Sequence, residues 1–156
     1  MRKPATLITG ANGEMGHGLI AALHDKNHGN ILAMDLNALD NSIFDYCSKN
    51  IIGNILDVDL IDRLNSEYEF DTIYHLAALL STEAEFSPRS AHDVNVSGTL
   101  NLLHMALEQG KSQGRRIKFF FPSSIAVYGL ENLEEKKLAG IVRENSYSNP
   151  STIYGC

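Results

Sequence analysis

Three glycines spaced three residues apart follow the first apolar run of the chain, at Gly10, Gly13 and Gly16. Residues 5–8 before them read Ala-Thr-Leu-Ile, which is typical of a short buried strand. The apolar residues after them recur at helical spacing, at Met15, Leu19, Ala22 and Leu23. Between a strand and a helix, the first glycine permits a tight turn, the second lets a pyrophosphate approach the backbone, and the third lets the helix pack on the strand. Three glycines also make an ordinary loop, but these flanks favour a dinucleotide-binding turn.

We predict that this turn and the start of the following helix bind the phosphates of a dinucleotide. Free backbone N–H groups at a helix N-terminus point at such a ligand, and the helix dipole favours its negative charge. The cofactor-binding residues predicted for this segment are Gly10, Asn12, Gly13, Glu14, Met15 and Gly16.

Length, charge and cysteine content narrow the class of protein further. A chain of 156 residues is long enough for about one domain with its own core. The net charge of −6 argues against nucleic-acid and membrane-surface partners, and no apolar run approaches the roughly 18 residues of a membrane span. Cys47 and Cys156 are too few for a disulfide framework and lack metal-ligand spacing, so we expect no metal site and a cytoplasmic location. We expect Cys47 to be a small, buried or half-buried residue.

Short apolar runs alternate with helical patterns along the chain. We predict strands over residues 5–9, 31–34, 51–52, 72–76 and 117–121, and helices over 14–26, 60–67, 89–109 and from near Ser151. Continuous apolar strands are typical of a parallel sheet that is covered on both faces. The order therefore predicts an α/β fold, a Rossmann-like doubly wound parallel sheet.

Two segments depart from this alternation. Residues 130–149 contain a charged run, at Glu131, Glu134, Glu135, Lys136 and Lys137, and form either a solvated excursion with a short polar helix or a lid over a substrate site. The sequence stops just after the helix predicted near Ser151 begins. We therefore expect residues 1–156 to be an incomplete domain, truncated at the start of that helix.

An aspartate closes the second predicted strand. Asp35 lies about 20 residues after Gly16, the spacing at which an acidic side chain accepts hydrogen bonds from the adenosine ribose and repels a 2′-phosphate. No arginine follows it directly, since the next residues are Leu36 and Asn37. This pattern favours NAD over NADP as the cofactor. The alternative is a helix-capping or surface aspartate.

Asp57 follows the third strand region and has two interpretations. It accepts from the adenine amino group, or it caps the helix predicted to begin near Leu60, and both are compatible because Asp59 is also available as a cap.

The fourth predicted strand ends in His75-Leu76-Ala77-Ala78. The small residues let the backbone pass beneath a pyrophosphate and the nicotinamide ribose, so Leu76, Ala77 and Ala78 are predicted to bind the cofactor. A histidine inside an apolar strand is more often a core residue with satisfied hydrogen bonds, and we expect this of His75.

A serine pair, Ser123-Ser124, follows the apolar run 117–122. Ligands of open α/β sheets bind at the carboxyl ends of the strands, so two hydroxyls there can hold a substrate oxygen. A turn is the other interpretation of the pair.

These features, taken in order, resemble the extended short-chain dehydrogenase/reductase family, the NAD-dependent epimerase/dehydratase group, over essentially the whole chain. The matching motifs are Gly10-x-x-Gly13-x-x-Gly16, Asp35, Asp57, His75-Leu76-Ala77-Ala78, Asn95, Ser123-Ser124-Ile125-Ala126-Val127-Tyr128-Gly129 and Tyr154-Gly155. Within the family, three segments are most similar to L-threonine 3-dehydrogenases of the short-chain type: Leu79-Leu80-Ser81, Pro122-Ser123-Ser124-Ile125-Ala126 and Pro150-Ser151-Thr152-Ile153-Tyr154-Gly155. UDP-sugar 4-epimerases share most of these signatures.

The resemblance implies roles for individual residues. Tyr154 is similar to the catalytic tyrosine, and Ser124 to the serine that orients the reacting group. Asn95 resembles an asparagine that orders the site and is placed with the cofactor residues, while Ser81 and Ser123 resemble substrate-contacting positions. The implied reaction moves a proton from a substrate alcohol to tyrosinate and a hydride to NAD.

The family also implies a partner for the tyrosine and a second copy of the chain. A free tyrosine has a pKa near 10 and needs a neighbouring cation, but the family's lysine, four residues later, would fall beyond Cys156. The resemblance implies that residues 1–156 are an incomplete NAD-binding domain and that the C-terminal substrate domain is absent from this chain. We therefore expect this chain to be nearly inactive. The resemblance also implies a homodimer of the full-length protein through the helix 89–109. Along this helix we predict one apolar stripe, formed by Val94, Leu100, Leu103, Ala106 and Leu107. Val96, Leu102 and Met105 widen the apolar surface beyond what one face of the sheet requires.

Three functions follow, with a small-molecule substrate in the first two. The chain is part of a threonine dehydrogenase-like oxidoreductase, of a nucleotide-sugar 4-epimerase or dehydratase, or of a non-catalytic NAD-binding module.

Overall fold

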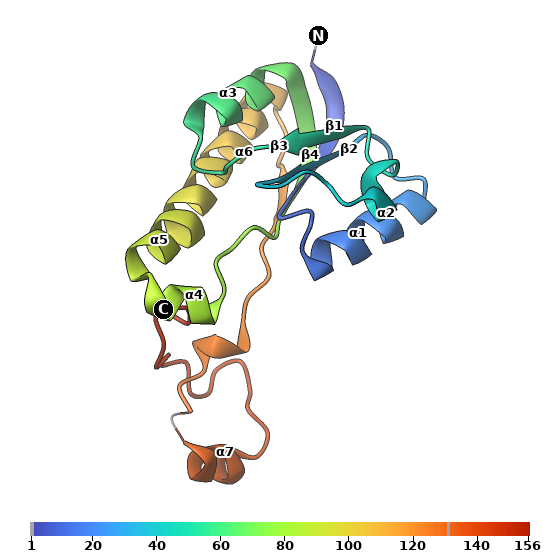
Figure 1. The fold of residues 1–156 in the computed structure, drawn as a ribbon. Coiled ribbons are helices and arrows are strands. Elements are labelled where there is room, and N and C mark those ends of the chain that lie inside the picture. The colour runs from blue at the N-terminus through green and yellow to red at the C-terminus, as the bar shows by residue number, and fades with distance from the viewer. Residues whose placement is uncertain (1, 131) are drawn as a thin grey trace. The chain divides into compact units, whose positions relative to one another are not determined.

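The computed structural model describes residues 2–130 and 132–156 (Figure 1). These residues form two compact units. The first unit comprises the chain up to Ala78 together with Asp93–Phe121, and the second comprises Leu79–His92 and Pro122–Cys156. Glu131 of the charged run lies outside the described residues.

The described part of the first unit is built on a five-stranded parallel sheet in the order β3-β2-β1-β4-β5. The strands are β1 (Lys3–Thr9), β2 (Ile31–Asp35), β3 (Lys49–Ile52), β4 (Tyr68–His75) and β5 (Lys118–Phe120). This arrangement confirms the predicted Rossmann-like α/β fold. β4 begins at Tyr68, four residues before the predicted start at residue 72. The prediction missed its first half because apolar and polar side chains alternate there and do not form a continuous apolar run.

Helices cover both faces of this sheet (Figure 1). One apolar cluster joins the sheet to α1 (Glu14–Asp25) and α2 (Asn41–Phe44), and the other joins it to α3 (Val58–Glu67) and α6 (Thr99–Gln113). Neighbouring residues of β1 point to opposite faces: Leu7 belongs to the α3–α6 cluster and Ile8 to the α1–α2 cluster. Burial on both sides explains the continuous apolar runs of these strands.

The long helix predicted over 89–109 is helical from Pro88 to Gln113, but in three parts. A π-helical segment, η1 (Asp93–Gly98), separates α5 (Pro88–His92) from α6. The predicted apolar stripe is divided between two faces of α6: Ala106 is buried with Leu102 and Met105, whereas Leu100, Leu103 and Leu107 are 42–58% exposed. Apolar residues occupy both faces of α6, so the spacing alone does not show which of them pack on the sheet.

The second unit contains short elements. They are α4 (Ser81–Phe86), α5, a 3-10 turn at Ile125–Val127 and α7 (Leu133–Ala139). α7 confirms the short polar helix predicted within residues 130–149. The helix predicted from Ser151 was wrong, since the described residues 151–156 form a turn. Cys156 N–H donates to Thr152 O with the i→i+4 spacing of an α-helix, but a single bond of this kind makes a turn and not a helix.

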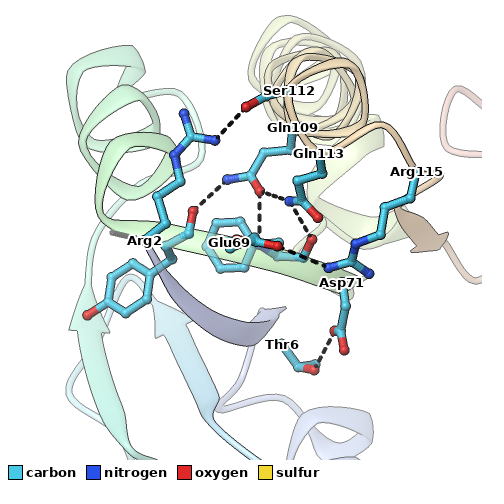
Figure 2. Close-up of polar contacts among 10 residues, drawn as sticks. Arg2, Thr6, Glu69, Asp71, Gln109, Ser112, Gln113 and Arg115 are labelled. Atoms are coloured by element: carbon cyan, nitrogen blue, oxygen red, sulfur yellow. Dashed lines mark hydrogen bonds and ion pairs between the residues drawn. The ribbon is translucent and has the colours of Figure 1, made fainter.

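A β-bulge interrupts the pairing of β1 with β4. Ala5 pairs with Phe70 but Thr6 pairs with Thr72, which leaves Asp71 as the extra residue. The Asp71 carboxylate accepts a hydrogen bond from the Thr6 hydroxyl at 3.1 Å (Figure 2).

Side chains of α6 bind backbone groups of β4 just before this bulge (Figure 2). Gln109 is fully buried; its Oε1 accepts from Phe70 N–H at 2.9 Å, and its Nε2 donates to Tyr68 O at 2.8 Å. Gln113 Nε2 donates to Phe70 O at 3.1 Å and to Gln109 Oε1 at 2.6 Å. The burial of Gln109 was not predicted from the sequence, although Gln109 follows Leu102, Met105 and Ala106 at helical spacing.

Candidate cofactor site and substrate residues

The glycine turn connects β1 to α1 at the carboxyl end of the sheet. Gly10 has a φ of +69°, and a Cβ there would lie 2.6 Å from Ala77 N and 2.7 Å from Leu76 C. A Cβ on Gly16 would overlap the carbonyl group of Ala11. Glycine is therefore required at the first position by backbone conformation and by space, and at the third by space. At Gly13 the constraint is weaker: a Cβ would make one tight contact, with Gly10 O at 3.3 Å.

The start of α1 leaves its first backbone N–H groups unprotected. Gly13 is the N-cap residue, and no side chain of the described residues makes a cap hydrogen bond to this helix. Such a helix end, next to a glycine-rich turn, is typical of a binding site for the phosphates of a dinucleotide. Glu14 and Met15 have exposed side chains, so the contribution predicted for them is that of their backbone N–H groups.

Asp35 ends β2 beside the glycine turn. Its Oδ2 accepts from Asn12 N–H at 3.0 Å and its Oδ1 from Asn37 N–H at 3.1 Å. These two bonds fix the half-buried carboxylate, and each oxygen keeps a lone pair for a ribose hydroxyl. The carboxylate therefore closes a local turn, and the ribose contact predicted for it remains a prediction.

Asn12 links the glycine turn to the loop after β2. Its Nδ2 donates to Ala38 O at 2.7 Å, and its Oδ1 accepts from Asp40 N–H at 2.9 Å. The side chain is thus engaged with protein, and the cofactor contact predicted for Asn12 remains a prediction.

Asp57 is exposed and is the N-cap residue of α3. Its Oδ1 accepts from Leu60 N–H at 3.0 Å, which explains why the helix begins at Val58 and not at Leu60. The capping interpretation is confirmed, and contact with an adenine remains a prediction.

His75, the last residue of β4, is fully buried, as expected, with both ring nitrogens hydrogen-bonded. Nδ1 lies 2.8 Å from Thr9 Oγ1, and Nε2 lies 2.8 Å from Thr99 Oγ1. Phe119 and Phe121 pack against the ring, with centroids 6.0 and 5.5 Å away. Burial lowers the pKa of His75 from 6.5 to about 4, so the imidazole is neutral at pH 7.

Acidification should destabilise the fold through this histidine. The unfolded chain binds a proton below pH 6.5, whereas the folded chain excludes it down to about pH 4. The contribution of neutral His75 to the free energy of unfolding is fully present above pH 6.5 and falls by roughly 3 kcal/mol as the pH falls toward 4. Urea denaturation at a series of pH values measures the effect. His75→Gln, which does not titrate, should be less stable at pH 7 but have a flatter pH dependence; parallel pH profiles would contradict this.

The residues predicted to act on the substrate all lie in the second unit. Ser124 Oγ accepts from Ala126 N–H at 3.2 Å and so caps the 3-10 turn. A Cβ on Gly155 would overlap the carbonyl group of Ala126, so the turn that carries Tyr154 packs on the turn that follows Ser124. Ser81 begins α4, and Ser123 is exposed. The structure thus brings the segments of Ser124 and Tyr154 together.

Glu85 connects α4 to the tyrosine turn, and sequence reasoning missed it. Its Oε1 accepts from Ile153 N–H at 2.8 Å. The helix that begins at Ser81 is therefore tied to the residue before Tyr154. A lone glutamate in a short helix carries no signal for such a long-range bond.

Among the residues that the structure describes, no group of three His, Cys, Asp or Glu side chains is placed to hold a metal ion. No helix of the described ranges has the length and apolar character to cross a membrane. Cys47 is half-buried, as expected, and burial raises the pKa of its thiol to about 11.

The five-stranded parallel sheet and its helices define a Rossmann-like α/β domain. Its glycine turn lies at the carboxyl end of the sheet, where the ligands of such folds bind. Residues 6–156 match the model of the NAD-dependent epimerase/dehydratase family, and the chain belongs to this family, which is NAD-dependent. An uncharacterised epimerase/dehydratase from Staphylococcus saprophyticus is 35% identical over 130 residues, which are 79% of this chain and 37% of that protein.

Solved structures show the same relationship. A monomeric L-threonine 3-dehydrogenase from a metagenome is 35% identical, with a TM-score of 0.75, over 96% of this chain and 44% of that enzyme. UDP-glucose 4-epimerase from Thermotoga maritima has a TM-score of 0.78 at 23% identity, over 97% of this chain and 46% of the epimerase, a likeness of fold alone. The chain thus spans less than half the length of these relatives.

Proposed function

We propose that this chain is the NAD-binding part of an oxidoreductase whose reaction is similar to that of L-threonine 3-dehydrogenases. The observation that carries the proposal is the left-handed Gly10 turn, closed against Ala77 and lying beside a fixed Asp35 carboxylate. The 35% identity to a solved L-threonine 3-dehydrogenase supports the choice of reaction.

In this proposal the two units divide the work. The first holds NAD through the glycine turn, Asp35 and the backbone of 76–78, with Asp57 and Asn95 beside it. NAD, when bound, supplies the hydride acceptor. In the second unit, Tyr154 takes the proton of the substrate hydroxyl and Ser124 orients that hydroxyl, while Ser81 and Ser123 bind the rest of the substrate.

A homodimer is also part of the proposal. The outward face of η1 and α6 exposes Val96, Leu100, Leu103 and Leu107, each between 42 and 58% accessible. Apolar side chains gathered on one helix face are typical of a contact surface, here for a second copy of the chain.

Calorimetry with the two nucleotides tests the cofactor assignment. We expect NAD to bind at least about tenfold more tightly than NADP, since the Asp35 carboxylate accepts ribose hydroxyls and repels a phosphate. Asp35→Ala should weaken NAD and narrow the difference. Asp62→Ala, an exposed aspartate of α3, makes the same change in charge and should leave both affinities unchanged. Tighter binding of NADP by the wild type would contradict the assignment.

Turnover assays separate the candidate reactions. The substrates are L-threonine with NAD, and UDP-galactose, tested on this chain and on its fusion to the remaining portion of the similar threonine dehydrogenase. Threonine oxidation by the fusion supports the proposal, and turnover of UDP-galactose alone favours an epimerase. NAD binding without turnover of either substrate favours a non-catalytic module.

A further inference from the structure

A series of side-chain hydrogen bonds joins three segments of the first unit at the carboxyl end of the sheet. Thr9, directly before Gly10, contacts His75 Nδ1 at 2.8 Å. His75 Nε2 contacts the hydroxyl of Thr99, the first residue of α6, at 2.8 Å. The Thr99 hydroxyl in turn donates to the backbone carbonyl of Asn95 in η1, at 2.7 Å.

Chemistry sets the direction of every bond in this relay of Thr9, His75, Thr99 and Asn95. The Thr99 hydroxyl has one proton and gives it to Asn95 O, so it must accept from His75, whose Nε2 is therefore protonated. In a neutral imidazole the other nitrogen is then an acceptor, and it takes the proton of the Thr9 hydroxyl. One histidine tautomer alone satisfies the relay.

The relay connects the end of β4 to the π-helical turn η1. β1 and β4 already pair through their backbones at this point, with Leu76 N–H donating to Thr9 O at 3.0 Å. The strands do not need the histidine for their register. What His75 adds is the orientation of the Thr99 hydroxyl, whose bond to the carbonyl four residues earlier is of the kind that bends helices. This bond from the Thr99 hydroxyl to Asn95 O holds the π-helical turn that contains Asn95.

We infer that His75, as the Nε2-protonated tautomer, is a positioning residue for NAD: through Thr99 it fixes the π-helical turn of Asn95 relative to the strand end from which the Gly10 turn departs. This inference rests on the proposed function, because it gives the π-helical turn a task in cofactor binding.

Nitrogen NMR of histidine-labelled protein tests the tautomer without any cofactor. We expect the His75 ring to show a protonated Nε2 and a bare Nδ1 at neutral pH. A ring protonated at Nδ1, or one that exchanges between tautomers, would overturn the inference.

Calorimetric titration with NAD tests the positioning role. Thr99→Val should weaken NAD binding by roughly tenfold, and Thr99→Ser, which keeps the hydroxyl, should restore it. Thr72→Val is the matched control, because Thr72 is buried on the same strand as His75 but outside the relay, and its affinity should equal that of the wild type. Wild-type affinity in Thr99→Val, or an equal loss in Thr72→Val, overturns the inference alone. A wild-type chain that binds no NAD overturns the proposed function and the inference with it.

Discussion

Gly10→Ala is expected to abolish measurable NAD binding, with a loss of affinity greater than about a hundredfold. The Gly10 backbone is left-handed, which costs a residue with a Cβ about 1–2 kcal/mol. The new Cβ would also lie 2.6 Å from Ala77 N and 2.8 Å from Ala77 Cα. Backbone atoms cannot rotate away as a side chain can, so the turn itself must move. The residues that would bind the phosphates move with it.

Gly18→Ala is the matched control. A Cβ at Gly18 meets no described atom within 4 Å, and the residue lies inside α1. Alanine forms helices better than glycine by about 1 kcal/mol, so this variant should be slightly more stable and bind NAD as the wild type does. Calorimetry measures the affinities and urea denaturation the stabilities. Wild-type affinity in Gly10→Ala would show that the glycine turn does not determine binding.

The sequence predicts local features of this molecule well. The glycine turn, the Asp35 strand end and the five strands were predictable because each depends on neighbouring residues whose spacing is visible in the chain. The capping of α3 by Asp57 was predictable for the same reason. The family resemblance then placed Ser124 and Tyr154 in segments that the structure brings into contact.

Features that depend on distant contacts were not predictable. The apolar stripe of the long helix was assigned incorrectly because α6 carries apolar residues on both faces, and contacts with the sheet decide that Leu102, Met105 and Ala106 are the buried ones. Glu85 was missed because its partner, Ile153, lies far along the chain. Gln109 was missed because a glutamine is usually a surface residue, and its partners, the backbone groups of Tyr68 and Phe70, lie far along the chain.

Gln109→Leu is expected to destabilise the protein by roughly 4 kcal/mol. Leucine matches the side chain in size but leaves Phe70 N–H and Tyr68 C=O without the bonds that the amide makes, and each buried group left unpaired costs about 1–3 kcal/mol. β5 pairs with β4 only from Thr72 onward, so no neighbouring strand of the described residues replaces these bonds.

Gln113→Leu is the control for the same network, with an expected cost of roughly 1 kcal/mol. Gln113 is half-buried, and its Oε1 is a buried atom without a hydrogen-bond partner among the described residues, so its removal offsets part of the two bonds lost. Urea denaturation measures the free energy of unfolding of both variants, and equal losses of stability would contradict this account of the glutamine network. The network lies at the first half of β4, whereas the glycine turn contacts the residues just beyond its end. Folded Gln109→Leu should therefore keep its NAD affinity, while folded Gly10→Ala should lose it, which separates a defect of the core from a defect of the site.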